Sequence, residues 1–172
     1  MDTNHDTKKL FMYAILCLSL AVGLSSGVFS NYFKEVFAVD SVQRGLLEIP
    51  RETPGILCVV ILTALSGIGN LSLMVMAYGF CTLGLAVLGL LSPSYFIMQI
   101  FLFSFSLGEH MMMPLRDSIA MDLSGEGKTG TFLGQLKGKM TLASMTASAA
   151  VFIGYRMGIF WFGDGVIPSF VA

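Results

Sequence analysis

The sequence contains few charged residues. Asp, Glu, Lys and Arg make up 12% of its 172 residues, whereas apolar types make up 55%. A soluble globular domain carries about 25% charged residues, so this composition excludes a water-soluble fold. It also excludes a disordered chain, which would need low hydrophobicity and high net charge. The composition therefore predicts an integral membrane protein.

The sequence also lacks a surplus of positive charge and an even set of cysteines. Ten basic and eleven acidic residues give a net charge of -1, so the charge balance does not indicate nucleic-acid binding. The three cysteines, Cys17, Cys58 and Cys81, lie inside apolar runs without metal-ligand spacing, and we interpret them as core side chains. The histidines are His5 and His110, and no catalytic Ser-His-Asp or Cys-His pair is indicated. The sequence thus predicts no enzyme, cofactor or metal site.

Long uncharged runs divide the chain into helices. A helix that crosses a bilayer needs about 20 mostly apolar residues. The stretch from residue 53 to residue 108 has no charge but is too long for one crossing, and turn residues at 66–70 and 92–94 divide it. The sequence predicts an all-α membrane protein, a single domain over residues 1–172 with a bundle of about five transmembrane helices. The expected spans are 10–33, 45–65, 71–91, 95–121 and 140–162, followed by a short tail at 163–172.

The first apolar run and the basic residues predict the orientation. The first run is too long for a signal peptide and lacks a small-x-small cleavage site, so we interpret it as a retained helix. Basic residues favour the cytoplasmic side of a membrane. With the N-terminus inside, five of them are cytoplasmic and two are outside; they are Lys8, Lys9, Lys128, Lys137 and Lys139, and Lys34 and Arg44. We therefore expect a multi-pass protein of the plasma membrane with a cytoplasmic N-terminus.

Three charged side chains interrupt the second span. Glu48, Arg51 and Glu52 follow i,i+3 and i,i+4 spacing, which places them on one helix face beside Pro50 and Pro54. A charge near the bilayer centre costs about 2.5–3.5 kcal/mol. Two interpretations stay open: a self-paired ion cluster with a structural role, or a substrate or coupling site. The prolines are typical of the broken helices of transporters and equally of simple kinks.

The fourth span carries a second set of charged side chains. Glu109 and His110 lie near its middle, and Arg116 lies seven residues beyond Glu109, two turns along the same face. Glu109 and His110 are candidate proton acceptors, although His110 also fits a hydrogen-bonded core histidine. For Arg116 we favour a functional role, because an unpaired guanidinium in a membrane is too costly. The candidate substrate or coupling residues are Glu48, Arg51, Glu52, Glu109, His110 and Arg116.

Small residues recur at four-residue spacing in the fifth span. Such stripes allow membrane helices to approach closely. The spacing predicts tight packing against another helix at Gly130, Gly134, Gly138, Gly154 and Gly158.

Several stretches, in their order and spacing, resemble the N-terminal half of a bacterial major facilitator superfamily (MFS) transporter. Residues 27–33 and 34–45 resemble the end of that family's first helix and its first outer loop. Residues 48–55, Glu-Ile-Pro-Arg-Glu-Thr-Pro-Gly, are similar to the second helix of one bacterial branch. Residues 114–118 resemble a fourth-helix segment that carries an arginine in many members, and residues 127–134 resemble the following cytoplasmic loop.

This resemblance implies a secondary transporter that moves a small solute by alternating access, with its site near the midplane between two halves. The implied partners are the lipid bilayer and a small-molecule solute, with proton coupling as one option. Two departures matter. The loop at 66–70 lacks the family's charged signature, and the chain supplies about five helices where the family usually has twelve.

These departures lead to two hypotheses. The first is a truncated N-terminal piece of a transporter, inactive alone, which needs a missing C-terminal half or a partner chain. The family places the fifth span against that missing half, which suits its small-residue stripe. The alternative is a non-transporting membrane interaction or assembly subunit.

Overall fold

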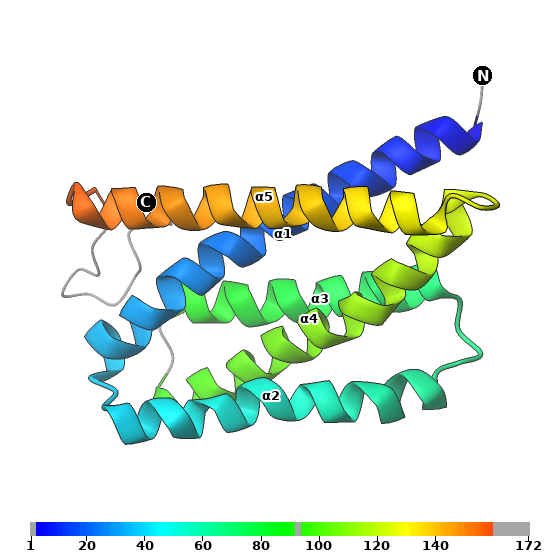
Figure 1. Cartoon of the computed structure of the whole chain (residues 1–172). Helices are drawn as coiled ribbons and strands as arrows, with labels where there is room; N and C mark the ends of the chain where they lie inside the picture. Colours follow the sequence, from blue (N-terminus) through cyan, green and yellow to red (C-terminus); the bar gives the residue numbers. More distant parts are fainter. Residues whose placement is uncertain (1–2, 92–93, 160–172) are drawn as a thin grey trace. The chain divides into compact units, whose positions relative to one another are not determined.

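The computed structural model describes residues 3–91 and 94–159, which form five α-helices and no strand (Figure 1). The all-helical class predicted from the composition is therefore confirmed. The helices are α1 (Thr3–Phe37), α2 (Ser41–Ala64), α3 (Asn70–Leu90), α4 (Tyr95–Ser124) and α5 (Thr129–Arg156).

Three of these helices are long and apolar enough to cross a membrane. They are the segment Asp6–Phe37 of α1, together with α3 and α4. This agrees with the expectation of a membrane protein. The other two helices, α2 and α5, overlap predicted spans but are less apolar, since α2 carries four charged side chains and α5 is rich in Gly, Ser, Thr and Lys. Their crossing of the bilayer stays a prediction.

Helix ends differ from the predicted span ends because charge ends an apolar run without ending a helix. α1 and α4 continue through charged residues, and α5 begins at Thr129, eleven residues before 140. α5 ends at Arg156 rather than at 162, and Gly158 adopts a positive φ of 69° just beyond this end. The rest of that predicted span and the predicted tail at 163–172 lie outside the described residues, apart from residues 157–159.

A side-chain cap and a pair of glycines explain two of the connections between helices. Asp40 caps α2: its carboxylate accepts bonds from the backbone N–H groups of Val42 and Gln43, both at 2.8 Å. The side chain of Gln43 accepts a bond of 3.1 Å from the backbone of Asp40, which completes a capping box. Between α4 and α5, Gly125 and Gly127 have φ values of 81° and 70°, a conformation that favours glycine.

The chain divides into two compact units. The first unit contains α1 up to Asn31, α5 and the last turn of α4. Within it, α1 and α5 make a close contact at Gly23, where an added Cβ would lie 2.5 Å from the carbonyl oxygen of Ser144. The hydroxyl of Ser148 donates a hydrogen bond of 3.0 Å to the carbonyl of Gly23. This contact therefore depends on the missing side chain of Gly23. Whether the chain is one membrane domain, as the sequence suggests, stays a prediction.

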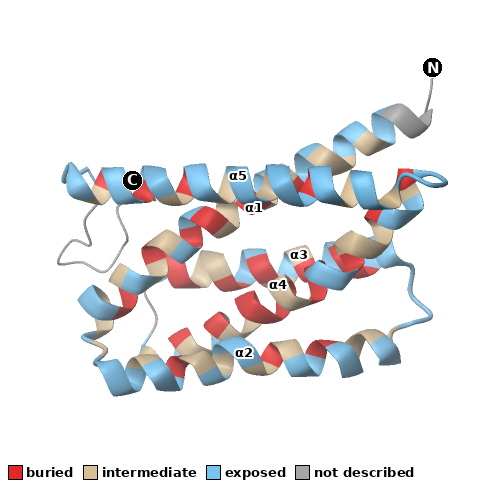
Figure 2. Ribbon diagram, viewed as in Figure 1, coloured by how far each residue is buried: buried red, intermediate tan, exposed pale blue. Residues whose placement is uncertain are grey.

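The second unit contains the end of α1, α2, α3 and most of α4. Its helices α3 and α4 approach most closely at two glycines. A Cβ added at Gly84 would lie 2.7 Å from the backbone nitrogen of Phe105, and one added at Gly108 would collide with the carbonyl oxygen of Ala77. Figure 2 shows buried residues along both α3 and α4. The buried core side chains of these two helices include Leu73, Leu88, Met98, Leu102 and Met111. These contacts fix the helix that carries Glu109 and His110.

Candidate functional site

Charged side chains of α2 and α4 meet within the second unit and form what we call the α2–α4 cluster. Its members are Glu48, Arg51 and Glu52 of α2 and Glu109 and His110 of α4. On α2, the Arg51 guanidinium lies 3.2 Å and 3.4 Å from the two carboxylate oxygens of Glu48. The self-pairing allowed by the i,i+3 spacing is thus present, and it neutralises Arg51 within its own helix.

His110 joins α4 to α2. Its Nε2 atom lies 3.8 Å from a carboxylate oxygen of Glu52, a separation at which an ion pair forms when the imidazole is protonated. The ring lies against Gly55, where an added Cβ would be 3.1 Å from two of the ring atoms. The absence of a side chain at Gly55 therefore makes room for the imidazole. The sequence brought out His110 and Glu52 separately, and the structure brings them together.

Glu109 lies beside this pair on α4. It interacts electrostatically with Arg51 and Glu52 of α2 and with Cys81 of α3. Among the described residues its carboxylate makes no hydrogen bond and no ion pair. Glu109 is consequently a partly buried carboxyl group whose interactions with its neighbours are electrostatic rather than direct bonds.

The contacts described for Arg116 lie outside the α2–α4 cluster. Its guanidinium donates through Nε to Asp117 Oδ1 at 2.8 Å, and its second nitrogen lies 2.8 Å from the same oxygen. The side chains of Arg116 and Asp117 are 15% and 30% exposed. Nearby, Asn70 of α3 donates a hydrogen bond of 2.9 Å to Ser118. The spacing had placed Arg116 on the stripe of Glu109, and its immediate partner is the adjacent Asp117.

Ser106 is a site residue that sequence reasoning missed. Its hydroxyl donates a short hydrogen bond to the backbone carbonyl of Arg51, a contact between residues 55 positions apart. The only signal in the sequence is a hydroxyl in an apolar run, four residues before His110, which places it on the same face of α4.

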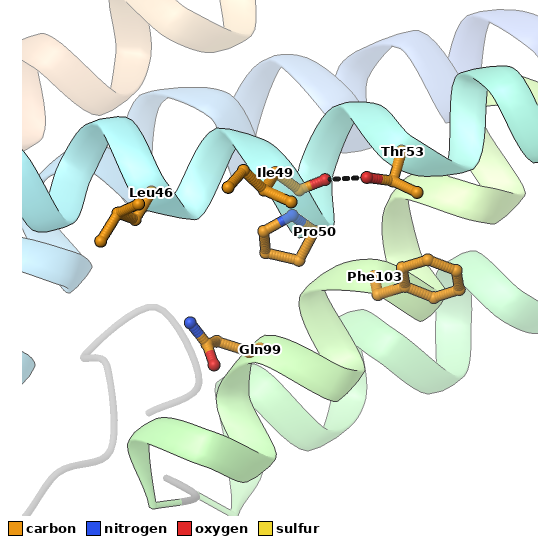
Figure 3. Close-up of a pocket in the computed structure, with 6 residues that line it drawn as sticks. All are labelled: Leu46, Ile49, Pro50, Thr53, Gln99 and Phe103. Carbon is orange, nitrogen blue, oxygen red and sulfur yellow. Dashed lines mark hydrogen bonds between the residues drawn. The ribbon is translucent and has the colours of Figure 1, made fainter.

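A pocket of about 410 Å³ lies between α2 and α4 next to the cluster (Figure 3). In the close-up, Gln99 of α4 and Pro50 of α2 face one another across it. The hydroxyl of Thr53 is occupied by a bond of 2.6 Å to the carbonyl of Ile49, which leaves the Gln99 amide as the unbonded polar side chain of the lining. The lining residues are Leu46, Ile49, Pro50, Thr53, Gln99 and Phe103. The pocket is therefore mainly apolar, with one amide.

The predicted packing glycines of α5 behave differently from one another. Gly130, Gly134 and Gly138 have no described atom within 4 Å of an added Cβ, so their face is open in this part of the chain. Gly154 is buried, and Gly158 has a positive φ beyond the helix end. Tight packing of the open stripe against another helix stays a prediction.

Within residues 3–91 and 94–159, no three His, Cys, Asp or Glu side chains are arranged so that they could hold a metal ion together. Comparison with known proteins adds no further constraint. No protein-family model matches the chain, and no curated protein and no solved structure matches it.

Proposed function

We propose that the chain is the N-terminal piece of a secondary transporter of the MFS type, which moves a small solute across the plasma membrane and is inactive alone. The observation that carries this proposal is the α2–α4 cluster. It lies near the middle of α2 and of the 30-residue α4, one of the helices long and apolar enough to cross a membrane.

The exposure of the α2 charges supports a transport site. The side chains of Glu48, Arg51 and Glu52 are 43%, 47% and 62% exposed, and their helix also exposes Leu46 and Ile56. Charged side chains within a membrane usually face a bundle interior or a water-filled cavity, because exposure to lipid is costly. In this proposal the charges face an aqueous path that a second half or partner completes.

The pocket beside the cluster supports a small-molecule role. Ligand pockets commonly measure about 300–1,000 Å³ and combine apolar walls with a few polar groups. The open pocket between α2 and α4 has mainly apolar walls and offers Gln99 as its polar side chain. The cluster would then supply charge, and the pocket apolar contact, on successive turns of the same two helices.

The test starts from the source DNA beyond the codon for Ala172. We expect that frame, or a frame one base away, to continue into further apolar helices. Proteoliposomes that contain the longer product should give solute-induced currents in a panel of small solutes, whereas the 172-residue chain alone should give none. Uptake by the isolated chain as a monomer would reject the inactive-piece proposal.

The open glycine stripe of α5 favours a second candidate, a membrane interaction or assembly subunit. Gly130, Gly134 and Gly138 present a face on which another helix fits closely. In this case a different membrane protein co-purifies with the native chain but not with Gly134→Leu. A clean single species argues against this candidate.

A further inference from the structure

The middle of α2 is held by fewer backbone hydrogen bonds than a regular helix. Pro50 and Pro54 lie inside this helix and have no N–H group, so the carbonyls four residues earlier, those of Leu46 and Pro50, lose their usual helical donors. A helix bends more easily where backbone hydrogen bonds are missing. Contacts from α4 therefore matter more here than elsewhere along α2.

Two polar side chains of α4 contact this segment. One is Ser106, whose hydroxyl donates a bond to the Arg51 carbonyl that does not depend on charge. The other is His110, which lies against Gly55 with its Nε2 atom 3.8 Å from Glu52. This second contact changes strength with protonation, because an imidazole attracts a carboxylate only when it is charged.

We propose that His110 and Glu52 form a proton-dependent latch that holds the proline-containing middle of α2 against α4. Protonation of His110 places a positive charge beside the Glu52 carboxylate and strengthens the contact. Loss of that proton as the pH rises removes the attraction. The latch is therefore closed while His110 carries its proton and released when the imidazole is neutral, and histidine is the side chain suited to a switch of this kind.

The other titratable and charged groups nearby do not reverse this sign. On α2, the Arg51 cation is already paired with Glu48 at 3.2 Å. On α4, Glu109 is a carboxyl group and attracts a protonated imidazole when it is ionised. On α3, the Cys81 thiol interacts electrostatically with Glu109 and adds no cation beside the imidazole. Arg51 is paired with Glu48, so it competes less with a protonated His110 for the carboxylates of Glu52 and Glu109.

This inference rests on the proposed function, since it gives the coupling proton a place and a structural effect. Proton uptake would close α2 onto α4, and proton release would free α2 to shift beside the pocket. The latch itself is a property of the folded chain, so it can be measured without transport.

The test is a double-mutant cycle on the full 172-residue chain in detergent micelles, with thermal unfolding measured at pH 5.5 and pH 8. The variants are Glu52→Gln, His110→Gln and their combination. At pH 5.5 we expect Glu52→Gln to lower the Tm by about 1–3 °C in the chain with His110 and by much less in the chain with Gln at this position. At pH 8 the two effects should be additive. Changes common to all four proteins cancel in the cycle. Because Glu109 interacts with Glu52, its titration differs between the variants, so the cycle is made in a Glu109→Gln background.

The matched control is His5→Gln, which removes the other histidine of the sequence and should leave the pH-dependent coupling intact. Equal coupling at both pH values, or none at pH 5.5, overturns the latch. If His110→Gln does not fold, the native chain and Glu52→Gln decide, because Glu52 is exposed and its Tm effect must shrink between pH 5.5 and pH 8. The two proposals fail separately. If the coupling is present at acidic pH but the longer product does not transport any solute, the latch is supported and the transporter proposal is rejected.

Discussion

Arg116 and Asp117 show how a charged pair is accommodated on an otherwise apolar helix. The guanidinium directs two nitrogens at one carboxylate oxygen, each at 2.8 Å, and both residues are partly buried. Charge-assisted bonds of this kind are about twice as strong as neutral ones. Adjacent positions on a helix do not normally face each other, so the pair exists because the long arginine side chain turns back along α4.

We predict that Arg116→Ala destabilises the chain by about 1–3 kcal/mol, because Asp117 loses its charged partner in a partly buried position. The measurement is urea or thermal unfolding in detergent micelles. Asp117→Asn and the double variant complete a cycle, in which the double variant should lose less than the sum of the two single losses. In the longer product, Arg116→Ala is also expected to abolish transport while expression is kept. Unchanged uptake would remove Arg116 from the candidate site.

At the scale of helices, packing depends on particular glycines rather than on their number. Gly84 and Gly108 bring α3 and α4 into backbone contact, whereas Gly79, also on α3, has open space around it. In a membrane, where lipid tails are as apolar as side chains, such close approach is a main source of helix association.

Gly108→Ala should therefore destabilise the second unit. The added methyl group collides with the Ala77 backbone, which cannot move away as a side chain can, and we expect a loss of about 1–3 kcal/mol. Gly79→Ala is the matched control, since a Cβ there meets nothing within 4 Å of the described atoms. It should be neutral or stabilising by up to about 1 kcal/mol, because alanine favours the helix. Thermal unfolding of both variants under one condition makes the comparison, and equal losses would contradict the packing argument.

Local patterns in the sequence predicted the helices and the contact between residues that lie close together in the sequence. The breaks at 66–70 and 92–94 follow from turn residues, and the Glu48–Arg51 pair follows from i,i+3 spacing. The His110–Glu52 and Ser106–Arg51 contacts join residues 58 and 55 positions apart, and only the packing of α2 on α4 creates them. Four-residue spacing brought out Gly130, Gly134 and Gly138, but the close helix contacts lie at Gly23, Gly84 and Gly108. The spacing of glycines shows that one face of a helix carries small residues, but it does not show which other helix packs against that face.

For the whole molecule, the number of membrane crossings is the main prediction. If α2 crosses the bilayer, its two ends lie on opposite sides, although its composition sets it apart from the three apolar helices. We predict that Ser41→Cys is labelled by a membrane-impermeant thiol reagent from outside the cell. Ser66→Cys and Glu126→Cys should be labelled only from the cytoplasmic side. Both expectations follow from a cytoplasmic N-terminus and successive crossings.

The labelling requires a background in which Cys17, Cys58 and Cys81 are replaced by serine or alanine. Ser94→Cys, between α3 and α4, serves as the internal reference because it should share the side of Ser41. Labelling of positions 41 and 66 from the same side would show that α2 does not cross, and the five-span topology would be wrong.

The backbone contact between α3 and α4 also has a kinetic consequence. With no side-chain layer between them at Gly84 and Gly108, these two helices have little freedom to slide or rotate against each other. They should behave as one rigid body, and the proline-containing middle of α2 should shift relative to it. Collective shifts of this type take microseconds to milliseconds, so exchange broadening in relaxation spectra should concentrate on α2 and spare α3.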